Sequence, residues 1–61
     1  MKIPKDPYIL LSYINTKLRD ENRDLDGLCQ NLELDRDQVE ATLSSIDYTY
    51  VSELNRFIAV M

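Results

Sequence analysis

Segment 22–33 nearly matches the spacing of a calcium-binding loop. That pattern, D-x-[DN]-x-[DN]-G-x5-E, places side-chain oxygens where they can surround the cation and a glycine where the loop must bend. The matching residues in this chain are Asn22, Asp24, Asp26, Gly27 and Glu33. The first position holds asparagine instead of aspartate, and the apolar residues between these positions have helical spacing. A divalent-cation sensor therefore stays an alternative function, but no metal ligands are assigned.

Residues suited to nucleophilic or acid–base catalysis are scarce in this chain. It has no histidine, the commonest general base, and Cys29 is its single cysteine. A reactive cysteine needs a cationic neighbour and some exposure, whereas Cys29 lies among leucines at helical spacing and is expected to be a buried thiol. Carboxylates two residues apart, such as Asp24 and Asp26, lie on different sides of a helix and form no acid–base pair. We therefore predict no enzyme activity, no catalytic residues and no cofactor.

Three amphipathic segments must position these residues. In each of them, apolar residues recur at helical spacing. Each segment is also preceded by an aspartate whose carboxylate can accept hydrogen bonds from the free amides of a helix N-terminus. These capping residues are Asp6, Asp24 and Asp35. The expected helices are residues 7–20, 24–32 and 36–46.

The C-terminal part of the chain changes from helical spacing to alternation. Residues 48–51 and 56–60 are rich in β-branched and aromatic side chains, which favour strands. Between them lies the polar loop 52–55, in which Asn55 can adopt the left-handed backbone conformation. This arrangement predicts a two-stranded β-hairpin.

The expected fold is a single, mainly α domain over residues 1–61. It has three short helices in a helix-turn-helix-like arrangement plus a C-terminal two-stranded β-hairpin, and is winged-helix-like. A chain this short buries only about 60% of the surface of its unfolded form, so its core is thin. The expected core consists of Leu10, Leu11, Ile14, Leu18, Leu25, Leu28, Cys29, Leu32, Leu34, Val39, Leu43, Ile46, Tyr50 and Phe57.

Charge is distributed unevenly along the chain, whose net charge is −4. Residues 1–19 carry four cations against one carboxylate, whereas residues 20–47 carry nine carboxylates against two arginines. An acidic surface on the second and third helices favours a basic protein partner over nucleic acid. We therefore expect a non-enzymatic protein-interaction module. Partner binding is assigned to Asp35, Asp37 and Glu40.

Two short helices followed by a hairpin are also the elements of a DNA-binding winged helix. There the second helix of the pair presents basic or amide side chains to base edges in the major groove. In this chain that helix offers Arg36 and Gln38, but its three carboxylates would face the DNA phosphates. DNA binding is therefore not expected. The alternative function is a transcription accessory factor that acts through dimerisation or through a partner protein.

Several apolar residues, among them Ile9, Tyr13 and Val60, lie outside the expected core. A two-stranded hairpin also has open edges, which invite a covering element or a second copy of the strand. We therefore expect a homodimer, paired through the edge of residues 56–60 or through the exposed side of the first helix. The sequence has no secretory signal and no run of about 18 apolar residues, the minimum for a membrane span. With its unpaired thiol, the protein is expected in the cytoplasm and away from membranes.

Five short motifs are spread over nearly the whole chain. They are I-P-K-D-P (Ile3 to Pro7), L-L-S-x-I-N-x-K-L-R (Leu10 to Arg19), L-x-x-L-C (Leu25 to Cys29), Y-x-Y (Tyr48 to Tyr50) and N-x-F (Asn55 to Phe57). In these motifs the chain resembles a family of very short bacterial proteins classed as a domain of unknown function. The resemblance implies a fold and no activity, because the motifs consist mostly of capping, core and turn residues. Similar proteins often have glycine where this chain has Asp47, which implies a strained exit from the third helix.

Overall fold

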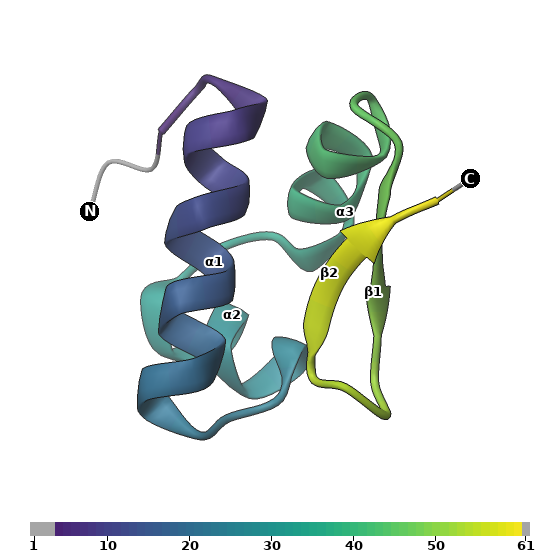
Figure 1. The fold of residues 1–61 in the computed structure, drawn as a ribbon. Coiled ribbons are helices and arrows are strands. Elements are labelled where there is room, and N and C mark those ends of the chain that lie inside the picture. Colours follow the sequence, from purple (N-terminus) through teal and green to yellow (C-terminus); the bar gives the residue numbers. More distant parts are fainter. Residues whose placement is uncertain (1–3, 61) are drawn as a thin grey trace.

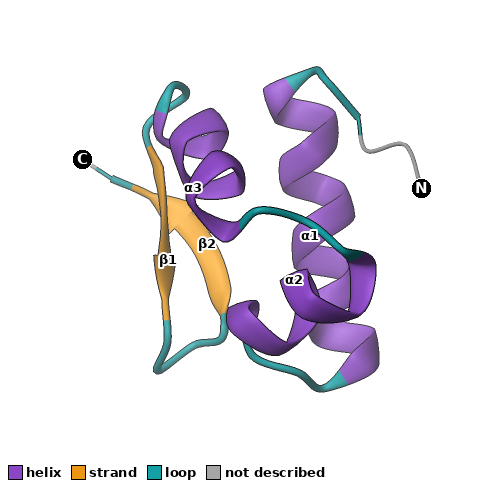
Figure 2. Ribbon diagram, turned by 180° about the vertical axis from the view of Figure 1, so that it is seen from behind, coloured by secondary structure: helices purple, strands orange, loops and turns teal. Residues whose placement is uncertain are grey.

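The computed structural model describes residues 4–60, so Ile3 of the first motif lies outside it. Three helices are followed by two antiparallel strands, which is the predicted fold class (Figure 1). The elements are α1 (Pro7–Glu21), α2 (Leu25–Leu32), α3 (Arg36–Ser44), β1 (Tyr48–Val51) and β2 (Arg56–Ala59). α1 contacts α2, α3 and β2, while α3 contacts β1. Seen from behind, α1 and β1 stand on opposite sides of the molecule (Figure 2). No helix in the described range is long and apolar enough to cross a membrane.

α1 spans Pro7–Glu21, and its start follows from the capping residue before it. The Asp6 carboxylate accepts hydrogen bonds from the backbone N–H groups of Tyr8 at 2.8 Å and Ile9 at 3.3 Å. The helix ends where Asn22 adopts a left-handed conformation with a φ of 53°, which asparagine tolerates better than most residues. The predicted helix is confirmed to within one residue at its C-terminal end.

α2 spans Leu25–Leu32 and contains the single glycine of the chain. The Asp24 carboxylate accepts a hydrogen bond from the Gly27 N–H at 2.7 Å. A Cβ atom at Gly27 would lie 3.1 Å from the Oδ1 atom of Asp24. Glycine therefore leaves room for the cap, although it costs a helix interior about 1 kcal/mol relative to alanine. The predicted helix is confirmed to within one residue at its N-terminal end, and the segment with calcium-loop spacing is largely helical.

α3 spans Arg36–Ser44 and is shorter than predicted. The Asp35 carboxylate caps it by accepting a hydrogen bond from the Asp37 N–H at 3.0 Å. At the other end, the N–H groups of Ile46 and Asp47 bond to carbonyls three residues earlier, at 3.2 and 3.0 Å. Such bonds close a tighter turn than the α-helix, so the predicted end at residue 46 is wrong. Asp47 then takes a φ of 62°, which agrees with the strained exit that the resemblance implied.

β1 (Tyr48–Val51) and β2 (Arg56–Ala59) form the predicted antiparallel hairpin. Tyr50 lies opposite Phe57, and the centroids of their rings are 5.6 Å apart. The loop between the strands ends at Asn55, whose φ of 52° is left-handed, as predicted. β2 ends one residue earlier than predicted.

Among residues 4–60, nine apolar side chains form the core, and all nine were predicted. They are Leu10, Ile14, Leu18, Leu25, Leu28, Cys29, Val39, Leu43 and Phe57. The prediction is wrong for five others, which are only partly buried and pack against the core from its rim: Leu11, Leu32, Leu34, Ile46 and Tyr50. Tyr13 and Tyr48 also join this rim. The rim is large because so small a domain has little interior.

Leu28→Ala should lower the free energy of unfolding by about 2–5 kcal/mol, because it leaves a cavity at a fully buried position. Leu32→Ala should lower the free energy of unfolding by a smaller amount, because the Leu32 side chain is partly exposed. Urea unfolding followed by circular dichroism measures both. Leu54→Ala is the control: Leu54 is 53% exposed, and the change should stay within about 0.5 kcal/mol. If Leu28→Ala and Leu32→Ala lowered the free energy of unfolding equally, Leu32 would not lie at the rim of the core.

Candidate functional site

The three carboxylates assigned to partner binding lie at the start of α3 and differ in their structural roles. Asp35 is the helix cap, and its carboxylate is bound to the backbone of Asp37. Glu40 is half-buried and forms an ion pair with Arg36 at 3.4 Å. Asp37 is exposed, and its carboxylate makes no ion pair within residues 4–60. Asp37 and Glu40 are three residues apart and therefore share one flank of α3.

Arg36 links α2 to α3 through two carboxylates. Its Nη1 donates to Oδ1 of Asp26 at 2.6 Å, and its Nη2 donates to Oε1 of Glu40 at 3.4 Å. Its guanidinium carbon also lies 5.7 Å from the centroid of the Tyr50 ring. The hydrogen bonds that Arg36 donates to Asp26 and Glu40 raise its pKa. The arginine that the sequence offered for reading DNA bases is thus engaged within the protein.

A cleft of about 250 Å³ lies between α3 and β1. Its lining residues are Glu40, Ser44, Tyr48, Thr49, Tyr50 and Phe57. Glu40 and Ser44, four residues apart, form the helix side of the cleft, and the residues of β1 form the opposite side. The sequence placed Glu40 on the partner surface but could not indicate a cleft there. The cleft exists because of the way α3 packs against the hairpin.

Two polar side chains attach the hairpin to the start of α2. The Tyr50 hydroxyl donates to Oδ1 of Asn55 at 2.6 Å and accepts a hydrogen bond from the Leu25 N–H at 3.3 Å. Nδ2 of Asn55 donates to the carbonyl of Arg23 at 2.8 Å. The sequence places Tyr50 in the core and Asn55 in the turn, but it does not predict this network. The only indication in the sequence that these two residues matter is that they stand in the Y-x-Y and N-x-F motifs.

Asn15 of α1 occupies part of the outer edge of β2. Its Oδ1 accepts a hydrogen bond from the Phe57 N–H at 2.8 Å, and its Nδ2 donates to the Phe57 carbonyl at 3.1 Å. The side-chain amide thus pairs with the strand as a neighbouring strand would. This contact is not predicted from the sequence, although Asn15 stands in the longest motif. A homodimer contact through the edge of residues 56–60 would have to displace Asn15.

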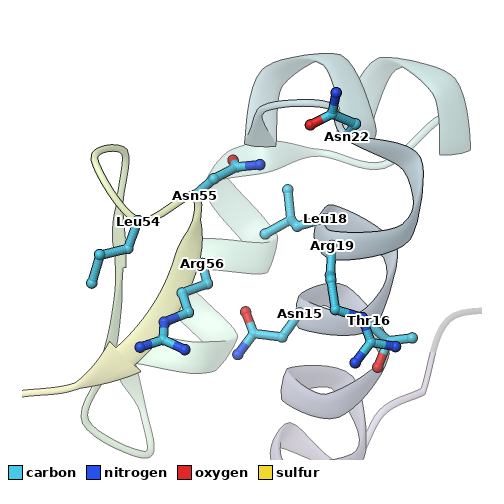
Figure 3. A pocket seen from close by; sticks show the side chains of 8 residues that line it. All are labelled: Asn15, Thr16, Leu18, Arg19, Asn22, Leu54, Asn55 and Arg56. Carbon is cyan, nitrogen blue, oxygen red and sulfur yellow. The ribbon is translucent and has the colours of Figure 1, made fainter.

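A second cleft, of about 440 Å³, lies between α1 and the hairpin. Its lining residues are Asn15, Thr16, Leu18, Arg19, Asn22, Leu54, Asn55 and Arg56 (Figure 3). The side chains of Arg19 and Arg56 lie on either side of Asn15 (Figure 3). Arg19 is paired with Asp20 at 3.0 Å, and the amides of Asn15 and Asn55 hold the hairpin. We assign no function to this cleft, because its polar groups largely serve the fold.

Cys29 is a buried thiol, as predicted. It is 3% exposed and forms no disulfide. Burial raises the pKa of the thiol, and the charge of Arg36 opposes this effect only in part. Because the thiolate is the nucleophilic form, this environment lowers the reactivity of Cys29.

Two of the three acidic residues of segment 22–33 serve the helices. Asp24 caps α2, and Asp26 binds Arg36. Within residues 4–60, no group of three or more His, Cys, Asp or Glu side chains is arranged to hold a metal ion.

The fold and its hydrogen-bond network define a small three-helix domain whose C-terminal hairpin is fastened to α1 and α2. The family described as Domain of unknown function (DUF4250) matches residues 4–57, and the chain belongs to this family. The match confirms the resemblance found in the sequence. It includes both asparagines that hold the hairpin. No curated protein and no solved structure matches the chain.

Tyr50→Phe should lower the free energy of unfolding by about 1–3 kcal/mol, because it leaves the Leu25 N–H and the Asn55 side chain without their partner. Tyr8→Phe is the matched control. Tyr8 is 65% exposed, so loss of its hydroxyl should change the free energy by less than about 0.5 kcal/mol. Urea unfolding measures both variants. If the two behaved alike, the network would not be what attaches the hairpin.

Proposed function

We propose that this protein is a non-enzymatic protein-interaction module whose acidic α2–α3 face binds a basic partner. The supporting observation is the charge imbalance of α2, α3 and the turn between them, where five carboxylates accompany one arginine, Arg36. The carboxylates are Asp26, Glu33, Asp35, Asp37 and Glu40. An excess of one sign on one face steers an oppositely charged partner toward it.

Asp37 is the residue best suited to meet this partner. It is exposed, and its carboxylate has no ion-pair partner within residues 4–60. Asp35 and Glu40 each hold another part of the protein, the start of α3 and Arg36. A contact with Asp37 therefore removes no interaction that the fold needs, whereas Asp35 and Glu40 would contribute mainly through their charge.

Asp37→Lys should abolish most of the capture of basic proteins by the immobilised protein from a native bacterial lysate. The reason is that it reverses the one freely exposed charge of the assigned set. Captured proteins are identified by mass spectrometry at low and moderate salt, and their retention should fall as salt rises. Glu53→Lys makes the same charge change in the exposed hairpin loop and should leave capture intact. The proposal would be contradicted if the amount of captured protein changed neither with Asp37→Lys nor with the salt concentration.

A transcription accessory factor is the second proposal. It is supported by the succession of α2, a short turn and α3, followed by a hairpin, as in a winged helix. Because α3 is acidic and Arg36 is engaged by Asp26 and Glu40, we expect contact with DNA only through dimerisation or a partner protein. A labelled mixed-sequence duplex therefore serves as the control ligand for the capture experiment. A salt-sensitive complex with the duplex alone would contradict this expectation.

Two further predictions remain proposals. The homodimer is proposed through either of its two predicted interfaces, the edge of residues 56–60 or the exposed side of α1, where Ile9 is 59% exposed. The cytoplasm is the proposed location, because its reducing environment suits an unpaired thiol such as Cys29.

A further inference from the structure

The register of the hairpin determines which backbone groups β1 presents on its outer edge. Asn15 binds both the N–H and the C=O of Phe57, so these groups point away from β1. Tyr50 lies opposite Phe57, and both members of such a non-hydrogen-bonded pair direct their N–H and C=O away from each other. The backbone N–H and C=O groups of Tyr48, two residues earlier, also point away from β2, because the orientation along a strand repeats every second residue. Within residues 4–60, these groups of Tyr48 and Tyr50 bind no other residue.

This edge has the features of a site for strand addition. β1 lies on the side of the hairpin away from α1 (Figure 2). Charged residues and proline protect exposed strand edges in many proteins. The strand Tyr48–Val51 contains neither. The cleft of about 250 Å³ between α3 and β1 lies beside it and offers space for a side chain of an added strand.

The flank of α3 that borders the edge is negatively charged. Glu40 and Ser44 line the cleft, and Asp37 lies on the same flank about one turn earlier. Arg36 offsets part of this charge by binding Asp26 and Glu40. One guanidinium against the carboxylates of Asp26, Asp37 and Glu40 leaves this flank net negative.

Charge also distinguishes between the possible occupants of the edge. A second copy of β1 carries no basic residue. Two-fold antiparallel pairing would place the acidic α3 of both copies on the same face of the joined sheet, where like charges repel. An extended segment with lysine or arginine at alternate positions would instead place its cations on the side of α3. Charge complementarity therefore favours a basic segment of another protein.

We propose that β1 binds an extended segment of a partner protein as an added β-strand. Basic residues of that segment lie opposite Tyr48 and Tyr50 and direct their side chains toward Asp37 and Glu40. This inference rests on the proposed function, because it describes how the acidic face holds its basic partner. Backbone hydrogen bonds provide the affinity, and the alternate side chains provide the specificity.

The test uses the intact, isotopically labelled protein and a short synthetic peptide in which lysine alternates with threonine. On binding, the amide groups of Tyr48 and Tyr50 should shift in the NMR spectrum and gain protection from hydrogen exchange. A second peptide, N-methylated at its lysines, keeps the charge but loses the donors that face β1. It should bind about tenfold more weakly, as expected for the loss of two net hydrogen bonds.

Two variants test the acidic flank separately from the backbone. Asp37→Asn and Glu40→Gln keep the size of each side chain, and each should weaken the unmethylated peptide about two- to fivefold. Glu53→Gln removes the same charge from the hairpin loop, where Glu53 is exposed, and should leave binding unchanged.

Equal binding of the two peptides, with Asp37→Asn weakening both, would overturn strand addition and leave the basic-partner function standing. The same conclusion would follow if a captured partner depended on Asp37 but left the Tyr48 and Tyr50 amides unprotected. Protection of these amides in concentrated protein without peptide would identify a second copy as the occupant and overturn the basic segment. If neither peptide bound and capture did not depend on Asp37, the proposed function would fail together with this inference.

Discussion

A two-stranded hairpin is marginal in water unless another element packs against it, and Asn15 makes the contact that fastens this one. Its side-chain amide donates to the carbonyl and accepts from the N–H of the same residue, Phe57. With these backbone groups satisfied, the Phe57 ring can lie in the core, where the residue is 2% exposed. Tyr50 and Asn55 attach the other end of the hairpin to the start of α2. The core and the hairpin therefore stabilise each other.

The same attachment decides which surfaces face outward. Because β2 packs against α1, β1 becomes the outer strand, and α3 packs beside it. Arg36 joins Asp26 to Glu40 without neutralising the flank of α3, and Asp37 stays exposed. An acidic flank and an open sheet edge thus lie next to each other. This proximity is the physical basis for proposing that one basic segment uses both.

The five motifs singled out in the sequence describe how the chain folds. Asn15, Tyr50, Asn55 and Phe57 all stand in these motifs, and each of them takes part in the hydrogen bonds that attach the hairpin. The carboxylates assigned to partner binding, Asp35, Asp37 and Glu40, lie at the start of α3 and outside the motifs. The motif residues therefore hold the hairpin, while the proposed binding surface depends mainly on other residues of the chain.

The sequence by itself determined the elements, because their signals are local. Apolar spacing located the three helices, and the caps Asp6, Asp24 and Asp35 marked their starts to within one residue. Tertiary structure decided the contacts between elements. Asn15 and Phe57 are 42 residues apart, and no local spacing specifies that one side chain will meet the other. Which carboxylates stay free, which strand edge is open and how deeply each leucine is buried depend likewise on how the helices pack around a very small core.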